Sequence, residues 1–170
     1  MATLDWQTVQ TGTLVAVKAF MDTTTAHGTS LVNLTLIEND EQLSDYWPRV
    51  RAGLEVVLKK NPANWIPEDV YMQVKLKNSL LVVGEDSTGE FVGFYVMTMR
   101  QVFDGLECFM WISYNKGEKS IIEFCEKRLK DFCQHAGARR IVTLSNRPGW
   151  AKFGERFGFK QTQIQFECEL

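Results

Sequence analysis

The last third of the chain, residues 120–159, contains the pattern that most restricts its fold. From Ser120 to His135, apolar side chains fall on one face and charged side chains on the other, with the 3.6-residue period of a helix that lies on a sheet. Gly137 can cap this helix in the left-handed conformation. The run at 140–144 is short and mostly β-branched, as in a buried strand. Together with a strand before the helix, these segments predict a right-handed βαβ unit, which usually carries a ligand at the carboxyl ends of its strands.

The chain before this unit predicts a strand, two helices and an antiparallel meander of three strands. The strands are expected at 31–37, 79–83, 91–99 and 106–113, and the helices from Asn39 or Asp40 to about Lys60 and from Pro67 onward. The Asp104-Gly105 pair is a strong signal for the hairpin between the last two of these strands. After the strand at 140–144, a short helix from Gly149 and a final strand complete the order.

Length and composition favour one globular domain with an N-terminal extension. The chain has 170 residues, and its Thr-rich start precedes the first predicted strand, so we divide it into an extension (1–30) and a domain (31–170). The net charge of −2 argues against a nucleic-acid partner. No apolar run reaches the roughly 20 residues of a membrane span, and no signal peptide is recognised. These features predict a cytoplasmic protein.

The cysteines and histidines do not follow a metal-binding pattern. None of the four cysteines belongs to a C-x-x-C pair, and neither of the two histidines has ligand spacing, so no metal site is expected. Cys125 and Cys133 fall on the inward face of the predicted helix at 120–135. We interpret them as small buried hydrophobic side chains.

The segment from His135 to Phe159, HAGARRIVTLSNRPGWAKFGERFGF, resembles the second half of a GNAT-superfamily N-acetyltransferase. In that family a helix, a strand, a polar turn with Asn and an ending of the type F-Y-x-x-x-G-F follow one another. The turn at 146–150 (Asn-Arg-Pro-Gly-Trp) is similar to the G-R-x-G-W turn of GNAT-like proteins that tailed phages encode near their structural genes. The resemblance covers roughly residues 31–170. It implies an α+β (α/β-like) GNAT fold: a mixed central sheet of about six to seven strands flanked by helices, with splayed central strands.

The resemblance implies an acetyl-CoA site between the splayed strands. GNAT enzymes bind the pyrophosphate with backbone N–H groups of a loop that opens the helix after the central strand. The implied cofactor-binding residues are Ile112, Tyr114, Asn115, Gly117, Lys119, Ser120 and Asn146. The loop departs from the family pattern, because Lys119 stands where a second glycine is usual and Glu118 places negative charge beside the phosphates. The alternative is that the loop is a plain turn and that Ser120 only caps the helix.

The catalytic residues of the family match this sequence less well than its scaffold does. The tyrosine that protonates the departing CoA thiolate corresponds to Phe153, which has no proton to donate. Tyr114, the nearest tyrosine in sequence, is the candidate for this role. Glu107 is the first candidate for the general base, and Asp104 is the second. Both carboxylates are equally well explained as polar residues at a strand end.

Two functions of different classes follow from the resemblance. In the first, which we favour, the chain is a phage-encoded GNAT-fold protein with a degenerate CoA loop and no tyrosine acid. It would act in the host cytoplasm or in the virion as an interaction module, with residues 1–30 binding a protein partner. In the second, it is an active acetyl-CoA-dependent N-acetyltransferase of a primary amine on a protein or small molecule. A third, intermediate function is CoA binding without acetyl transfer.

Overall fold

The computed structural model describes residues 32–116, 121–145, 149–162 and 168, excluding the side chains of 121–126 and 128. Its elements are β1 (Val32–Leu36), α2 (Asp40–Lys60), α3 (Pro67–Lys75), β2 (Leu80–Asp86), β3 (Phe91–Val102), β4 (Gly105–Asn115), α4 (Ile121–His135), β5 (Ala138–Thr143) and α5 (Trp150–Glu155). The element order predicted from the sequence is confirmed over this range. The predicted extension, residues 1–30, lies outside the described residues.

The described strands form one mixed sheet in the order β1-β2-β3-β4-β5. The first four strands pair antiparallel with their neighbours, and β5 pairs parallel with β4. The helix α4 connects these two parallel strands, as the predicted βαβ unit requires. The sheet has five strands in the described residues rather than the six to seven expected. The final strand expected after α5 runs into residues 163–167, which are not among them.

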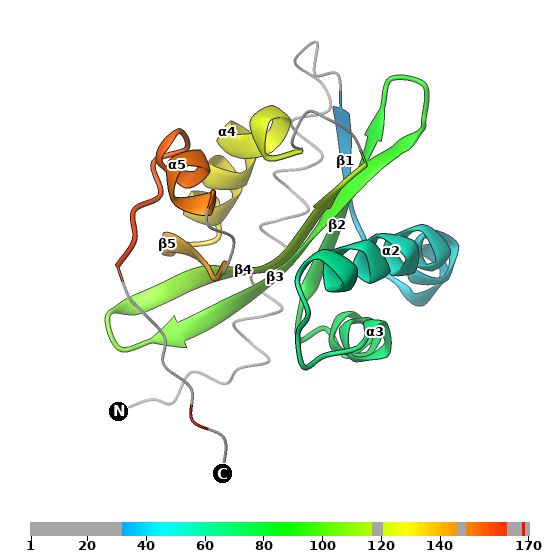
Figure 1. Ribbon diagram of the computed structural model, residues 1–170, viewed down its shortest axis with the longest axis horizontal. Helices are drawn as coiled ribbons and strands as arrows, with labels where there is room; N and C mark the ends of the chain where they lie inside the picture. Colours follow the sequence, from blue (N-terminus) through cyan, green and yellow to red (C-terminus); the bar gives the residue numbers. More distant parts are fainter. Residues whose placement is uncertain (1–31, 117–120, 146–148, 163–167, 169–170) are drawn as a thin grey trace.

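Two helix pairs cover the two faces of the sheet (Figure 1). On one face α2 and α3 pack on a core that includes Leu54, Val70 and Phe94. On the other face α4 and α5 pack on a second core that includes Met97 and Phe132. Both faces of the central strands are therefore buried. This explains why the sequences of β2 and β3 are nearly continuously apolar instead of alternating between apolar and polar residues.

Local sequence signals set the ends of the helices. Asn39 caps α2, and its Oδ1 accepts a hydrogen bond from the N–H of Gln42 at 2.9 Å. Pro67 occupies the first turn of α3, where its missing N–H costs nothing. Gly137 follows α4 with a φ of 80°, which confirms it as the left-handed cap. These positions are the ones that the sequence predicted for the same roles.

Cys133 is buried, as predicted, and it lies beside the buried Cys108 of β4. The hydrogen bond with Cys108 and the burial both raise the pKa of the Cys133 thiol, so this thiol stays protonated and acts as a packing group. The side chain of Cys125 lies outside the description. Among the described helices, none is long and apolar enough to cross a membrane.

Candidate functional site

The parallel strands β4 and β5 stop pairing before β4 ends. Their pairing runs from Leu106 opposite Ala138 to Met110 opposite Thr143, where β5 stops. The strand β4 continues to Asn115. Within the described residues this last part of β4 is paired only with β3, and we call this region, where β4 continues past the end of β5, the β4–β5 split. A split of this kind is where open α/β sheets bind ligands.

A β-bulge lies at the start of the split. Val96 of β3 is opposite Ile112 and Met97 is opposite Met110, which leaves Trp111 as the extra residue in β4. As a consequence Met110 packs in the core under α4, whereas Trp111 and Ile112 both pack on the α2–α3 side. The bulge thus turns two successive side chains to the same face of the sheet and leaves their backbone at the split.

Two of the described cofactor candidates of β4, Ile112 and Tyr114, direct their side chains into the α2–α3 core. Ile112 is buried there, and the Tyr114 ring packs against Phe94, with 5.6 Å between the ring centroids. The same ring lies over Gly53 of α2, where an added Cβ would come within 2.7 Å of it. A ligand in the split would therefore meet the backbone of these residues. Asn115 ends the strand opposite Gly93.

The remaining cofactor candidates, Gly117, Lys119 and Ser120 of the loop and Asn146 of the later turn, lie outside the described residues. The last described residue before the loop, Lys116, donates its backbone N–H to the carbonyl of Val92 at 2.7 Å. Its Nζ lies 4.0 Å from the carboxylate of Glu90, across the β3–β4 pair. The start of the loop is thus fixed to β3.

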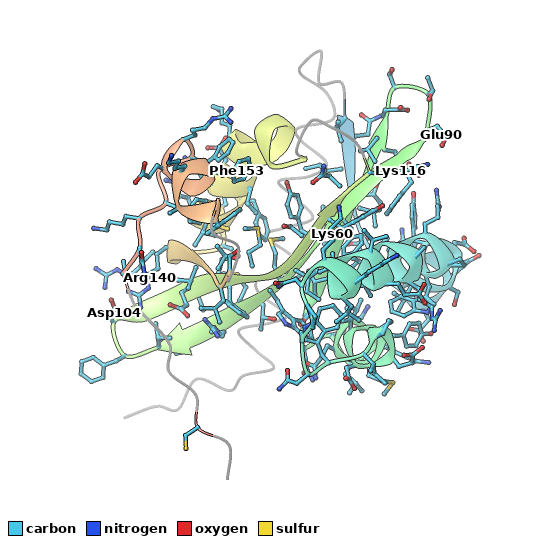
Figure 2. All side chains as sticks on the ribbon, in the orientation of Figure 1. Lys60, Glu90, Asp104, Lys116, Arg140 and Phe153 are labelled. Atoms are coloured by element: carbon cyan, nitrogen blue, oxygen red, sulfur yellow. The ribbon has the colours of Figure 1, made fainter. Side chains whose placement is uncertain are left out.

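Phe153, which the sequence resemblance matches to the family's tyrosine acid, belongs to an aromatic cluster on the α4–α5 side (Figure 2). Its ring centroid is 5.3 Å from that of Trp150 and 4.8 Å from that of Phe157. Tyr114 packs on the opposite face of the sheet. The structure therefore does not bring Tyr114 together with Phe153.

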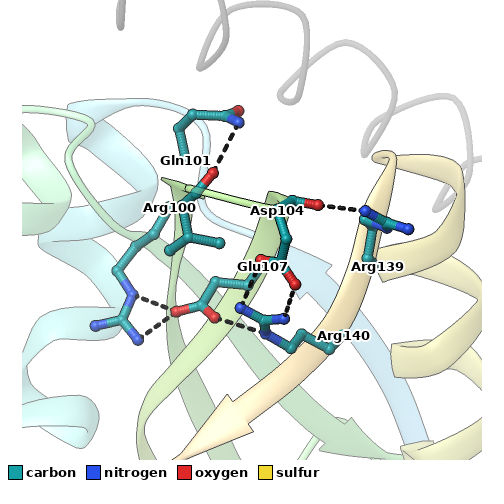
Figure 3. A network of polar contacts seen from close by, with 7 residues as sticks. Arg100, Gln101, Asp104, Glu107, Arg139 and Arg140 are labelled. Atoms are coloured by element: carbon teal, nitrogen blue, oxygen red, sulfur yellow. Dashed lines mark hydrogen bonds and ion pairs between the residues drawn. The ribbon is translucent and has the colours of Figure 1, made fainter.

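The first candidate base, Glu107, is held between two arginines (Figure 3). It is 6% exposed and lies directly opposite Arg100 of β3 and Arg140 of β5. Arg100 Nη2 donates to one carboxylate oxygen at 2.7 Å, and Arg140 Nε donates to the other at 3.0 Å. Both oxygens of the carboxylate are thus engaged by guanidinium groups.

Arg140 also binds the second candidate base, Asp104, in the β3–β4 hairpin. Its Nη1 and Nη2 donate to the two carboxylate oxygens at 2.6 and 2.9 Å. These hydrogen bonds lower the pKa of Asp104, and the two carboxylates raise the pKa of Arg140. Arg139 donates to the backbone carbonyl of Asp104. Figure 2 places this network at the other end of the sheet from Lys116, where the cofactor loop begins.

Sequence reasoning did not find this network. Arg100, Glu107 and Arg140 come from three strands, and only the strand register shows that they are neighbours. The available signal was an acidic residue at the start of one strand and an arginine in each flanking strand, which is typical of cross-strand ion pairs. In the described residues no group of three or more His, Cys, Asp or Glu side chains is placed to hold a metal ion.

The fold is shared with known acetyltransferases of the GNAT superfamily. A possible acetyltransferase from Clostridium difficile 630 superposes with a TM-score of 0.64 at 10% identity, covering 82% of this chain and 98% of the other. An aminoglycoside N-acetyltransferase in complex with CoA gives 0.63 at 9% identity, covering 82% and 94%. A ribosomal-protein-alanine N-acetyltransferase from Brucella melitensis biovar Abortus 2308 gives 0.63 at 10% identity, covering 82% and 99%.

No family model and no curated protein matches the sequence. The similarity is therefore one of structure, and it shows that this chain has the GNAT fold, with its mixed sheet and flanking helices. At about one residue in ten identical, it shows the fold alone.

Proposed function

We propose that this chain is a GNAT-fold interaction module that does not use its candidate carboxylate for acetyl transfer. The observation that carries this proposal is the position of Glu107, which is buried between Arg100 and Arg140 with both oxygens engaged. Phe153, at the position of the family's acid, offers no proton. The packing of Phe153 and the ion pairs of Glu107 both support a chain that keeps the scaffold of the enzyme without its acid–base groups.

A comparison of free energies supports this interpretation of Glu107. A general base accelerates a reaction by about 10²- to 10⁴-fold, which corresponds to about 3–5 kcal/mol. Hydrogen bonds to charged groups each contribute about 1.5–3 kcal/mol, and Glu107 accepts such bonds from two arginines. Breaking these hydrogen bonds would therefore cost about as much as a general base could provide.

The biological setting of the proposal rests on the turn at 146–150, which resembles the G-R-x-G-W turn of GNAT-like proteins encoded by tailed phages. We place the module in the host cytoplasm or in the virion, with residues 1–30 as the segment that binds a protein partner. Mass spectrometry of purified particles would detect the chain if it is a virion component. Deletion of 1–30 should leave a folded domain that no longer co-purifies with its partner, and continued co-purification would exclude the extension as the tether.

Calorimetric titration of the full chain with acetyl-CoA tests the degenerate CoA loop. We expect no saturable heat, because Lys119 and Glu118 replace the usual glycine and place negative charge in the loop. Thermal unfolding gives a second readout, since ligand at 100 times its dissociation constant adds about 2.7 kcal/mol to the stability. Micromolar binding would contradict the proposal for the loop.

The second candidate function is acetyl-CoA-dependent N-acetyl transfer to a primary amine. The observation that favours it is the split between β4 and β5, with the bulge at Trp111 beside it. The structural relative that is in complex with CoA adds support for acetyl-CoA as the cofactor. Under this alternative, acetyl-CoA binds in calorimetry and Gly117→Glu abolishes the binding.

A further inference from the structure

We propose that α2 and α3 form a binding site for the ammonium group of a lysine side chain on a partner protein. The site is a hollow of about 320 Å³ between the two helices, lined by Ser44, Trp47, Pro48, Glu68 and Tyr71. This volume is at the lower end of the range of about 300–1,000 Å³ that is typical of small-ligand sites. It is separate from the β4–β5 split, and no residue proposed above for catalysis or cofactor binding lines it.

Two aromatic rings that pack edge to face against each other line the hollow. The ring centroids of Trp47 and Tyr71 are 4.9 Å apart, and the ring planes make an angle of 68°. The face of an aromatic ring attracts a cation within about 6 Å of its centroid. The Tyr71 ring already makes this interaction within the chain, because the Nζ of Lys75 lies 5.7 Å from its centroid. An ammonium group in the hollow would meet the indole of Trp47 in the same way.

The carboxylate of Glu68 supplies a negative charge at the rim. Its side chain is 56% exposed, and its hydrogen bonds from Arg51 are 3.3 Å long. Charge-assisted hydrogen bonds are usually about 2.7–2.9 Å, so this contact is weak and leaves acceptor capacity on Glu68. Arg51 is closer to its other carboxylate partner, Glu55.

A proline inside α2 leaves a backbone carbonyl, that of Ser44, as a second acceptor. Pro48 has no N–H, so the carbonyl of Ser44, four residues earlier, receives no hydrogen bond from the usual helical donor. Both residues line the hollow. An ammonium group has three donors and no acceptor, and it therefore matches a carboxylate, a carbonyl and the indole face of Trp47. A compact ammonium suits a small hollow better than the planar guanidinium of arginine.

Carboxylates of both helix starts add negative charge near the hollow, beside the cations Arg51 and Lys75 that contact Glu68 and Tyr71. Asp40 and Glu41 lie in the first turn of α2, one helical turn before Ser44. Glu68 and Asp69 lie in the first turn of α3. A lysine side chain from a partner would therefore approach two acidic helix ends. This inference goes beyond the proposed function by naming the chemistry of the partner, and it holds whether or not acetyl-CoA binds.

The direct test is an NMR titration of the full chain with three short blocked peptides. They carry a single lysine, an Nε-acetyl-lysine or an arginine at the same position, and the readout is the indole N–H of Trp47, assigned with Trp47→Phe. We expect a saturable shift with the lysine peptide and none with the acetyl-lysine peptide at equal concentration. An equal response to acetyl-lysine, or tighter binding of the arginine peptide, would overturn the proposal.

Two variants make the test specific for the hollow. Glu68 and Glu55 both pair with Arg51 and are 56% and 54% exposed, but only Glu68 lines the hollow. Glu68→Gln should weaken binding of the lysine peptide about fivefold, as expected for one exposed charge pair. Glu55→Gln should leave it unchanged. Equal losses in the two variants, or no loss in Glu68→Gln, would contradict the site. Unchanged dispersion of the remaining amide signals verifies that both variants are folded.

Discussion

Arg140 lies directly opposite Glu107 across the parallel β4–β5 pair, and its Nε donates to Oε2 of Glu107 at 3.0 Å. The same guanidinium reaches Asp104 in the β3–β4 hairpin. One side chain of β5 therefore fixes both carboxylates that could serve as a base. It also holds β5 to β4 at one end of their pairing. The split between the two strands lies at the other end.

Replacing Glu107 should destabilise the fold by more than a surface charge does. Glu107→Gln removes the charge that Arg100 and Arg140 share, and we expect a loss of about 2 kcal/mol in the free energy of unfolding. Urea unfolding at pH 7 measures this loss. Glu55→Gln is the control, because its ion pair with Arg51 is exposed and should matter by less than about 0.5 kcal/mol. Equal effects would show that the Glu107 network is energetically unimportant.

The ion pair of Asp104 with Arg140 should make stability depend on pH. The pKa of Asp104 is lowered in the folded protein, so its contribution is fully present above the unfolded pKa of about 4 and is lost as the pH falls through the folded value. Wild type should therefore exceed Asp104→Asn in stability by a constant amount from pH 7 to about pH 5, and the difference should shrink below about pH 4. Unfolding midpoints over this range measure it. A difference that stays constant to pH 3 would show that the carboxylate charge is not involved.

Gly93 should not tolerate a side chain. Where β3 crosses the end of β4, a Cβ on Gly93 would lie 2.2 Å from the carbonyl oxygen of Tyr114. Gly93→Ala must push the two strands apart, and we expect a loss of about 3 kcal/mol in urea unfolding. Gly149→Ala is the matched control, because nothing lies within 4 Å of its added Cβ. Its effect should stay within about 0.5 kcal/mol. Similar losses for both variants would refute the proposed contact.

The secondary structure could be predicted because its signals are local. The helix cap at Asn39, the proline at the start of α3 and the Asp104-Gly105 hairpin each act over a few residues, and all three are found where the sequence placed them. The apolar period of α4 gave the crossover helix in the same way. The GNAT fold then followed from the order of the elements.

The site was less predictable because it depends on register. A single extra residue, Trp111, decides which side chains of β4 face α2 and α3, and nothing in its sequence neighbourhood marks it as a bulge. The pairing of Glu107 with Arg140 likewise requires the alignment of strands that are 33 positions apart. The hollow between α2 and α3 depends on how the two helices dock, which brings Trp47 to Tyr71.

Release of the CoA thiol from acetyl-CoA, followed in the presence of a panel of primary amines, tests the central claim most directly. With Glu107 held by two arginines and Phe153 in place of a tyrosine, wild type should release thiol no faster than the reaction without protein. Phe153→Tyr should be equally inactive, because the base position is still occupied. Amine-dependent thiol release by wild type, lost in Glu107→Gln at a temperature where that variant is folded, would contradict the account and establish the chain as an acetyltransferase.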